Sequence, residues 1–280
     1  MAEGLKDGAL EIPAASREPL VEVPAVRQQG RSSYRARFLL VYLLLAVVAG
    51  AAIGGVLLLI DRPAKEAAPA WSSWRPTGSS SGFPNKIAGY VSGRYRVPSG
   101  NPLVAVIAGA PTIQAGEEPV AIRAVAIHND PEGEPNDVSI VPTDNGVMYQ
   151  FCGLGPNCSI REGQPSQKRH QLLRREALEL ALYTFKYADG KNSVITLLPG
   201  NPAEPDAPPN ALFFQKNQLG TELDQPLERT LQRAEAPRAA EIGPLEGSTI
   251  DRLTQSRLFT YEFQAAPAGG AILVLAPLAG

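Results

Sequence analysis

SQKRHQLLRREALELALYTFKY, residues 166–187, is the most informative segment of the chain, because it combines a helical period with a broad apolar face. Ser166 stands where an N-cap is expected, so the predicted helix runs from 165 to 187. A face this broad predicts burial against a sheet. The side chains that form it are Leu173, Ala177, Leu180, Ala181 and Thr184, widened by Leu178, Leu182 and Phe185.

Strand-like runs lie on both sides of this helix, separated by glycine, proline and asparagine. The last two runs flank the tetrapeptide PAGG and predict a hairpin. Strands and helices do not alternate regularly, which predicts an α+β domain with a mixed or antiparallel sheet packed against the long amphipathic helix. The predicted strands are 103–109, 120–127, 138–151 with a turn at 144–146, 193–200, 257–266 and 271–278, and two further helices are predicted at 85–96 and 223–231.

Residues 38–60, FLLVYLLLAVVAGAAIGGVLLLI, contain no charged side chain. As a helix they would span about 34 Å, enough for a hydrocarbon core of about 30 Å. Their Leu, Ile, Val and Phe side chains favour insertion by roughly 7 kcal/mol in total. The segment therefore predicts a single transmembrane helix. The alternative is a cleaved signal peptide ending near 68–70, but the apolar run is longer than a signal h-region.

Positive residues crowd the N-terminal side of this segment and are sparser beyond it, where Asp61 and Glu66 accompany them. Because positive flanks tend to stay in the cytoplasm, we expect the N-terminus inside and the C-terminal domain outside the cell membrane. The expected organisation is a disordered cytoplasmic tail at 1–37, a transmembrane helix at 38–60, a flexible tether at 61–82 and an extracytoplasmic domain at 83–280.

Two further features of the N-terminal region suggest contacts. Ala46, Gly50 and Gly54 repeat every fourth residue and would let a second helix approach closely, in a homodimer or with a partner helix. Such small residues are also common in membrane helices without any partner. Trp71 and Trp74 lie in the predicted tether and are expected either at the lipid headgroups or against the folded domain.

The chain has two cysteines, Cys152 and Cys158. Outside the cell the compartment is oxidising, so these neighbours are predicted to form a disulfide. Gly153 and Gly155 between them can turn the chain back on itself. A redox couple would call for the closer Cys-x-x-Cys spacing, and a zinc site would need both histidines of the chain as well.

Two other patterns match functional motifs only by letter. Residues 78–82, GSSSG, fit G-x-S-x-G, yet no strand precedes them to form a nucleophile elbow. Residues 128–137, HNDPEGEPND, place carboxylates at alternate positions, as calcium loops do. Pro135 and Val141 occupy the positions where the calcium hand needs Gly and Glu, so a solvated acidic loop is favoured and calcium binding stays open.

The sequence gives neither histidine a clear catalytic or binding role. His128 has no partner that would make it a general base. His170 stands in a basic run at the start of the long helix, which is either an anion-binding face or, as is usual for such runs, a face in water. The basic residues around it are Lys168, Arg169, Arg174 and Arg175.

The composition excludes some classes of function but does not identify a specific one. A net charge of -2 and a pI near 5.8 give no basic field, so no nucleic-acid partner is expected. Abundant alanine and arginine suggest a bacterial source. No catalytic, cofactor-binding or metal-ligating residue is predicted. We expect a non-catalytic binding or assembly module anchored in the bilayer. The alternatives are a hydrolase of envelope material, whose scattered carboxylates would leave no motif, and a sensor or assembly factor that uses the cytoplasmic tail.

Overall fold

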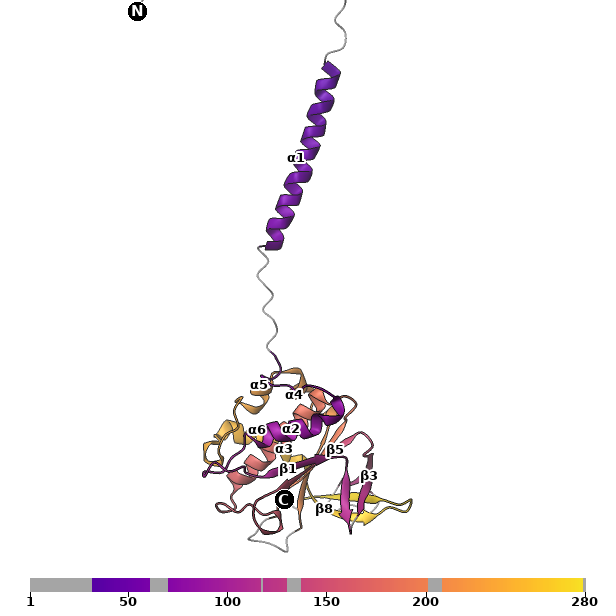
Figure 1. Ribbon diagram of the computed structural model, residues 1–280, viewed down its shortest axis with the longest axis vertical. Coiled ribbons are helices and arrows are strands. Elements are labelled where there is room, and N and C mark those ends of the chain that lie inside the picture. The colour runs from indigo at the N-terminus through magenta and orange to yellow at the C-terminus, as the bar shows by residue number, and fades with distance from the viewer. Residues whose placement is uncertain (1–31, 61–69, 117, 130–136, 201–207, 279–280) are drawn as a thin grey trace, which may run out of the picture. The chain divides into compact units, whose positions relative to one another are not determined.

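The computed structural model describes residues 32–60, 70–116, 118–129, 137–200 and 208–278 (Figure 1). The chain divides into two compact units, Met1–Ala67 and Ala68–Gly280. The first unit contains helix α1 (Ser32–Ile60), and the second contains the other described elements.

Between Phe38 and Ala52, the residues of helix α1 are apolar on every side of the helix. Its large apolar side chains from Phe38 to Val48 are each more than half exposed. Gly50 lies in the helix with open space where a side chain would be. The surroundings of Gly54 fall outside the described residues, so close packing of a second helix stays a prediction. Within the described part of the chain, the structure holds no helix with the length and apolarity that crossing a membrane requires.

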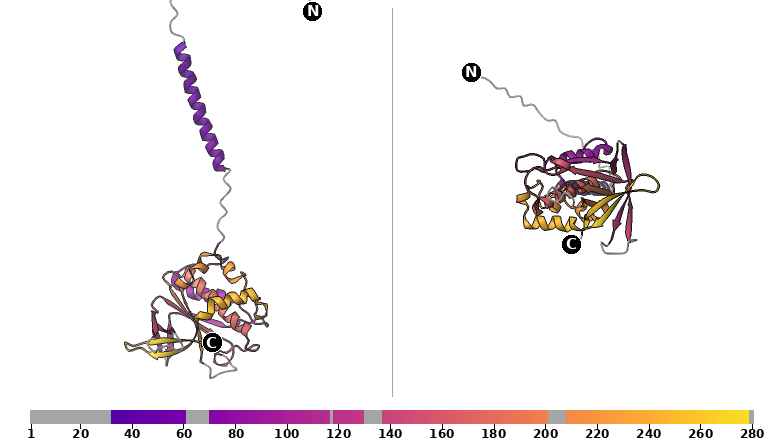
Figure 2. Two further views of the ribbon diagram at one scale, coloured as in Figure 1. Left: turned by 180° about the vertical axis from the view of Figure 1, so that it is seen from behind. Right: turned by 90° about the horizontal axis from the view of Figure 1, so that it is seen from below.

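The second unit is an α+β domain, as expected, and it is built on one mixed sheet of nine strands. The strand order is β1-β5-β6-β7-β8-β9-β3-β2, with β4 also paired to β3. Two neighbouring pairs, β5–β6 and β3–β9, are parallel, and the sheet curls into a nearly closed barrel (Figure 2). The strands are β1 (Ala105–Gly109), β2 (Thr112–Ala115), β3 (Glu118–His128), β4 (Val138–Pro142), β5 (Gly146–Cys152), β6 (Ser193–Leu197), β7 (Asn210–Gln215), β8 (Leu258–Ala265) and β9 (Ala271–Pro277).

Helices cover one face of this sheet, with α3 (Gln167–Tyr187) at their centre (Figure 1). Ser166 caps α3 as predicted, its hydroxyl accepting a hydrogen bond from the Arg169 amide at 3.2 Å. Helices α2 (Phe83–Ser92) and α6 (Pro244–Thr254) pack against α3. Two single-turn helices, α4 (Gly220–Asp224) and α5 (Leu227–Leu231), complete this layer.

The central strands are buried on both faces, which explains their continuous apolar sequence. In β6, Val194 faces the core beneath the helices, whereas Ile195 faces the interior of the barrel. Strand β7 alternates in the same way, with Phe214 under the helices and Phe213 inside the barrel. The sheet therefore separates two apolar cores that share its strands.

The structure refines several predicted elements. The β8–β9 hairpin is confirmed. The run 138–151 contains the expected turn, but β4 pairs with β3 whereas β5 pairs with β1 and β6. The helix expected at 223–231 is two short helices, because Pro226 has extended backbone and separates them. Helix α2 ends at Ser92, before Gly93.

The expectation that the basic run of α3 faces water is wrong for its second half. Arg174 is 3% exposed and Arg175 is fully buried. Arg175 donates to Glu246 at 2.8 Å and forms an ion pair with Glu179 at 3.3 Å. Helix α6 covers this side of α3 and supplies both Glu246 and Asp251, the partner of Arg174. The cations are buried because the covering elements carry matching carboxylates.

The structure decides between the two alternatives for the tryptophans: both pack on the domain. The Trp74 ring stacks on Tyr90 with centroids 4.0 Å apart, and Trp71 meets Tyr183 edge-on at 5.4 Å. The Trp71 carbonyl accepts a hydrogen bond from the Leu227 amide at 2.7 Å. The predicted tether, 61–82, is thus packed against the domain from Trp71 onward, while 61–69 lie outside the described residues.

Candidate functional site

The connection between β5, α3 and β6 creates the candidate site. Strands β5 and β6 run parallel, and α3 is the crossover between them. The carboxyl ends of both strands and the N-terminus of the helix therefore lie at one edge of the sheet. Ligand crevices of α/β sheets form at such edges, where the loops diverge and the first amides of the helix point outward.

A disulfide loop forms one wall of this edge. The predicted bond between Cys152 and Cys158 is confirmed, with an S–S distance of 2.06 Å and α carbons 4.3 Å apart. The Gly153 amide donates to the Cys158 carbonyl at 2.7 Å. A side chain at Gly153 would lie 2.2 Å from the Ser159 carbonyl oxygen, so only glycine allows the two arms of the loop to approach this closely.

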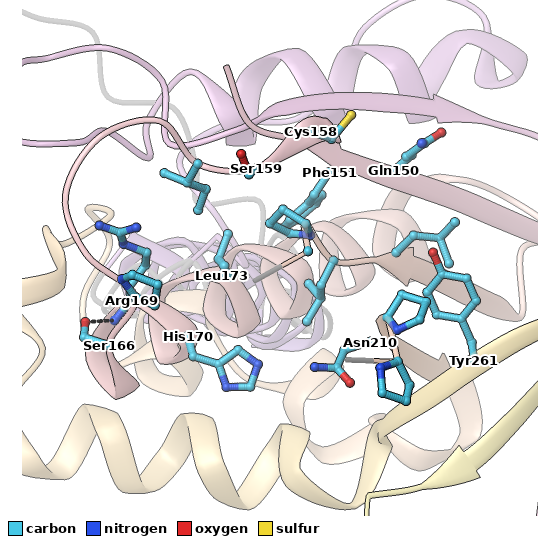
Figure 3. Close-up of a pocket in the computed structure, with 18 of the residues that line it drawn as sticks. Gln150, Phe151, Cys158, Ser159, Ser166, Arg169, His170, Leu173, Asn210 and Tyr261 are labelled. Atoms are coloured by element: carbon cyan, nitrogen blue, oxygen red, sulfur yellow. Dashed lines mark hydrogen bonds between the residues drawn. The ribbon is translucent and has the colours of Figure 1, made fainter. Parts of the chain in front are cut away.

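A cavity of about 1170 Å³ opens between this loop, the N-terminus of α3 and the start of β7 (Figure 3). Its apolar lining includes Phe151, Leu173 and a series of prolines that flank the strand ends. The volume is large enough for an organic ligand of moderate size. The polar side chains of the lining are Gln150, Ser159, Ser166, Gln167, Arg169, His170, Asn210 and Tyr261.

Arg169 and His170 supply one polar side of the cavity. Arg169 donates to the Glu162 carbonyl at 2.8 Å, which holds its guanidinium beside the loop that follows the disulfide. Burial and the nearby charge of Arg174 lower the pKa of His170 to about 4, against the weaker opposing effect of Asp251. His170 is therefore a neutral hydrogen-bonding group at neutral pH, and Arg169 is the only formal charge among the described lining residues.

Asn210 and Tyr261 lie on the opposite side of the cavity from Arg169, and Figure 3 shows the side chains of His170 and Asn210 projecting toward one another. The backbone carbonyl of Asn210 accepts from the Leu198 amide at 2.9 Å, which fixes the start of β7. The side-chain Oδ1 of Asn210 is buried and has no hydrogen-bond partner among the described residues. A buried acceptor of this kind calls for a donor from a ligand or from water.

The described lining contains no carboxylate. Glu176 and Glu179 are the two neighbouring carboxylates that could resemble a catalytic acid–base pair. Both are fully buried in the helical layer and do not line the cavity. The cavity therefore presents hydrogen-bonding groups and one cation on an apolar wall, a composition typical of ligand recognition.

The other sequence patterns do not gather at this cavity. Residues 78–82 lie in a 3₁₀ turn, Ser80–Gly82, that leads into α2, so the strand needed by a nucleophile elbow is missing there. His128 ends β3 on another part of the sheet. Most of the acidic loop 128–137 falls outside the described residues, so calcium binding stays untested. No group of three metal-binding side chains occurs within the described ranges.

Sequence reasoning singled out His170 and both cysteines but missed the other side of the cavity. Asn210 and Tyr261 come from strands that meet the α3 edge only in the folded sheet. The available signal was the pair Pro208 and Pro209, which directly precedes a strand. Prolines at a strand start favour a fixed, unpaired entry to the sheet, and here they line the cavity.

No protein-family model, no curated protein and no solved structure matches this chain.

Proposed function

We propose that the protein is a single-pass membrane protein whose C-terminal domain lies outside the cytoplasm and binds a small ligand in the cavity at the carboxyl ends of β5 and β6. The observation that carries the binding role is the cavity itself. It is large, it combines an apolar wall with separated polar groups, and it holds a buried acceptor without a partner among the described residues.

The membrane anchor rests on residues 38–60. They are free of charge over 23 positions, and the basic flank lies on their N-terminal side. The exposed apolar side chains of α1 are in keeping with a helix that needs a cover of lipid or protein. The disulfide supports the outer location of the domain, because such bonds persist in oxidising compartments.

A labelling experiment tests the topology. L245C places a thiol at a side chain that is 77% exposed, and S16C places one in the predicted cytoplasmic tail. We expect an impermeant maleimide to label L245C on intact cells and to label S16C only after lysis. The reverse pattern would overturn the proposed orientation, and equal labelling of both before lysis would overturn the anchor.

Mass spectrometry of the intact full-length protein tests binding. The protein, in detergent, is mixed with the small-molecule fraction of solubilised envelope, and bound adducts are weighed. Gly200 lines the cavity and has open space around it, so G200W should fill the cavity without disturbing the fold. G109W, at an equally open position at the end of β1, is the matched control.

We expect a discrete adduct on the wild type and on G109W that is lost from G200W. An adduct that persists on G200W would place the binding elsewhere, and the cavity proposal would fail. If no adduct forms on any of the three proteins, the binding role fails as well.

A further inference from the structure

The described lining of the cavity carries positive charge and no negative charge. Its described lining holds one cation, Arg169, and no anion, while His170 is uncharged at neutral pH. Outside the cavity, two cations of α3 are neutralised, because Arg174 pairs with Asp251 and Arg175 pairs with Glu179 and Glu246. Lys168 and Lys186 donate to backbone carbonyls. Arg169 donates to the backbone carbonyl of Glu162, and the carboxylate of Glu162, which accepts from Ser99 outside the lining, is the nearby negative charge that acts on it. The positive charge at this edge is therefore uncompensated by any described lining side chain.

The backbone adds to this polarity. The first four amides of a helix have no partner within it. In α3, Ser166 takes up one of them, because its hydroxyl accepts from the Arg169 amide, while its carbonyl accepts the first regular helical bond from the His170 amide at 2.9 Å. The amides of Gln167 and Lys168 have no partner among the described residues. Both Gln167 and the guanidinium-bearing Arg169 line the cavity, so donors and positive charge coincide there.

The side of the cavity opposite Arg169 carries a hydrogen-bond acceptor. Asn210 lines that side, and its Oδ1, which is covered from solvent, accepts no hydrogen bond from the described residues. A turn of the side chain into the cavity would offer this oxygen to a donor. A ligand that satisfies both sides carries an anionic group at one end and an N–H or O–H donor a few bonds away. The apolar lining of Phe151, Leu173 and the prolines suits a ring or alkyl body.

The charge decides the kind of anion. The guanidinium of Arg169 brings one positive charge, part of which the nearby Glu162 offsets, so it suits an anion with a single negative charge such as a carboxylate. A phosphate monoester carries about -1.5 to -2 at neutral pH and would leave excess charge in a partly apolar cavity. On the basis of the proposed binding role, we infer that the cavity binds a monocarboxylate with an adjacent N–H donor and an apolar body, as in an N-acyl amino acid or the C-terminus of a peptide.

A matched pair of fluorinated probes tests the inference. N-(4-fluorobenzoyl)glycine has the carboxylate, the N–H and the ring, and its primary amide, N-(4-fluorobenzoyl)glycinamide, lacks only the charge. Affinities are measured by fluorine NMR on the full-length protein in detergent at low salt. We expect the carboxylate probe to bind about tenfold more tightly than the amide, because one charge-assisted hydrogen bond distinguishes them.

Substitutions then assign the preference. R169Q should remove the tenfold difference and R169K should retain most of it. R161Q removes a neighbouring exposed arginine that does not line the cavity and should leave the preference unchanged. N210L should weaken both probes to a similar extent, since both carry the donor. Thermal melting of each variant checks that the fold is intact.

The outcomes separate this inference from the broader proposal. Equal binding of both probes that G200W abolishes overturns the carboxylate preference and leaves the cavity as a binding site. A preference that survives R169Q assigns the anion contact to another group and overturns the role of Arg169. If neither probe binds, the ligand class is wrong, and the adduct experiment on envelope molecules still tests the cavity.

Discussion

Two buried glutamates lie three residues apart on α3, and only one of them has hydrogen-bond partners among the described residues. Glu179 accepts from Arg94 at 2.8 Å and from the Tyr95 hydroxyl at 2.7 Å, and it pairs with Arg175. Glu176 is equally buried, but neither of its carboxyl oxygens has a partner among the described residues. Burial, assisted by the charge of Glu179, raises the pKa of Glu176 well above its ordinary value. Glu176 therefore keeps its proton to a higher pH in the folded domain than in the unfolded chain.

We predict that E176M stabilises the domain, and that E179M destabilises it. Folded Glu176 holds a proton that the unfolded chain releases above its ordinary pKa of about 4.5, so wild-type stability falls as the pH rises. The gain of E176M should therefore grow from pH 5 to pH 8, reaching about 1–3 kcal/mol from removal of an unpaired buried polar group. Thermal melting across this range measures it.

E179M is the matched control on the same helix. It leaves Arg175 buried with fewer partners and should cost about 3–5 kcal/mol. A loss of stability in E176M similar to that in E179M would mean that Glu176 has a structural partner, contrary to the environment described above.

At the scale of the element, the disulfide loop positions one wall of the cavity. Its short 3₁₀ turn, Pro156–Cys158, and the glycine contacts with Ser159 bring Ser159 and Ile160 to the start of the segment that leads into α3. The bond closes only a small ring, so in the chain-entropy model it stabilises the domain by about 2 kcal/mol. Its larger effect is to restrict the loop that carries the cavity wall.

We predict that the double variant C152S/C158S folds but melts about 4–8 °C lower, which is the shift that about 2 kcal/mol produces in a domain of this size. Binding of the carboxylate probe should weaken at temperatures where the variant is still folded, because the wall is no longer fixed. Dithiothreitol treatment of the wild type should reproduce both effects. A melting temperature unchanged by either treatment would show that the loop is held by its hydrogen bonds alone.

At the scale of the whole molecule, the folded domain begins earlier than the globular sequence pattern suggests. Trp71 and Trp74 form an aromatic cluster with Tyr90, Tyr183 and Tyr187 that joins the entering chain to α2 and α3. The Lys186 ammonium lies 5.6 Å from the Trp71 ring, and the Trp71 carbonyl receives the Leu227 amide. Trp71 and Trp74 are thus packed against the core, so this part of the segment before α2 is not a free spacer.

We predict that a chain starting at residue 70 melts at the same temperature as the full-length protein, whereas a chain starting at residue 83 is less stable by about 3 kcal/mol or more. The loss reflects the missing burial of two tryptophans and the exposed ring faces they leave behind. Calorimetry of the two truncated proteins measures the difference. Equal melting of both would show that the aromatic cluster contributes little to the domain.

Local patterns in the sequence predicted much of the secondary structure. The cap at Ser166, the length of α3, the β8–β9 hairpin and the pairing of Cys152 with Cys158 each depend on residues close together in the chain. Such features follow from propensity, periodicity and turn chemistry, which act over a few residues. The α+β class also followed, because it requires only the order and kind of the elements.

The sequence by itself thus determined the long helix, most of the strands, the disulfide and the α+β class, but it missed β2 and α6. The tertiary structure alone decided which strands are neighbours, which charges of α3 are buried and which residues face the cavity. Arg175 and Glu246 lie 71 positions apart, and Asn210 faces His170 only across the edge made by β5–α3–β6. The physical reason is that burial, ion pairing and cavity formation depend on the side chains of the elements that pack over a segment. A local sequence pattern contains no information about which elements those are.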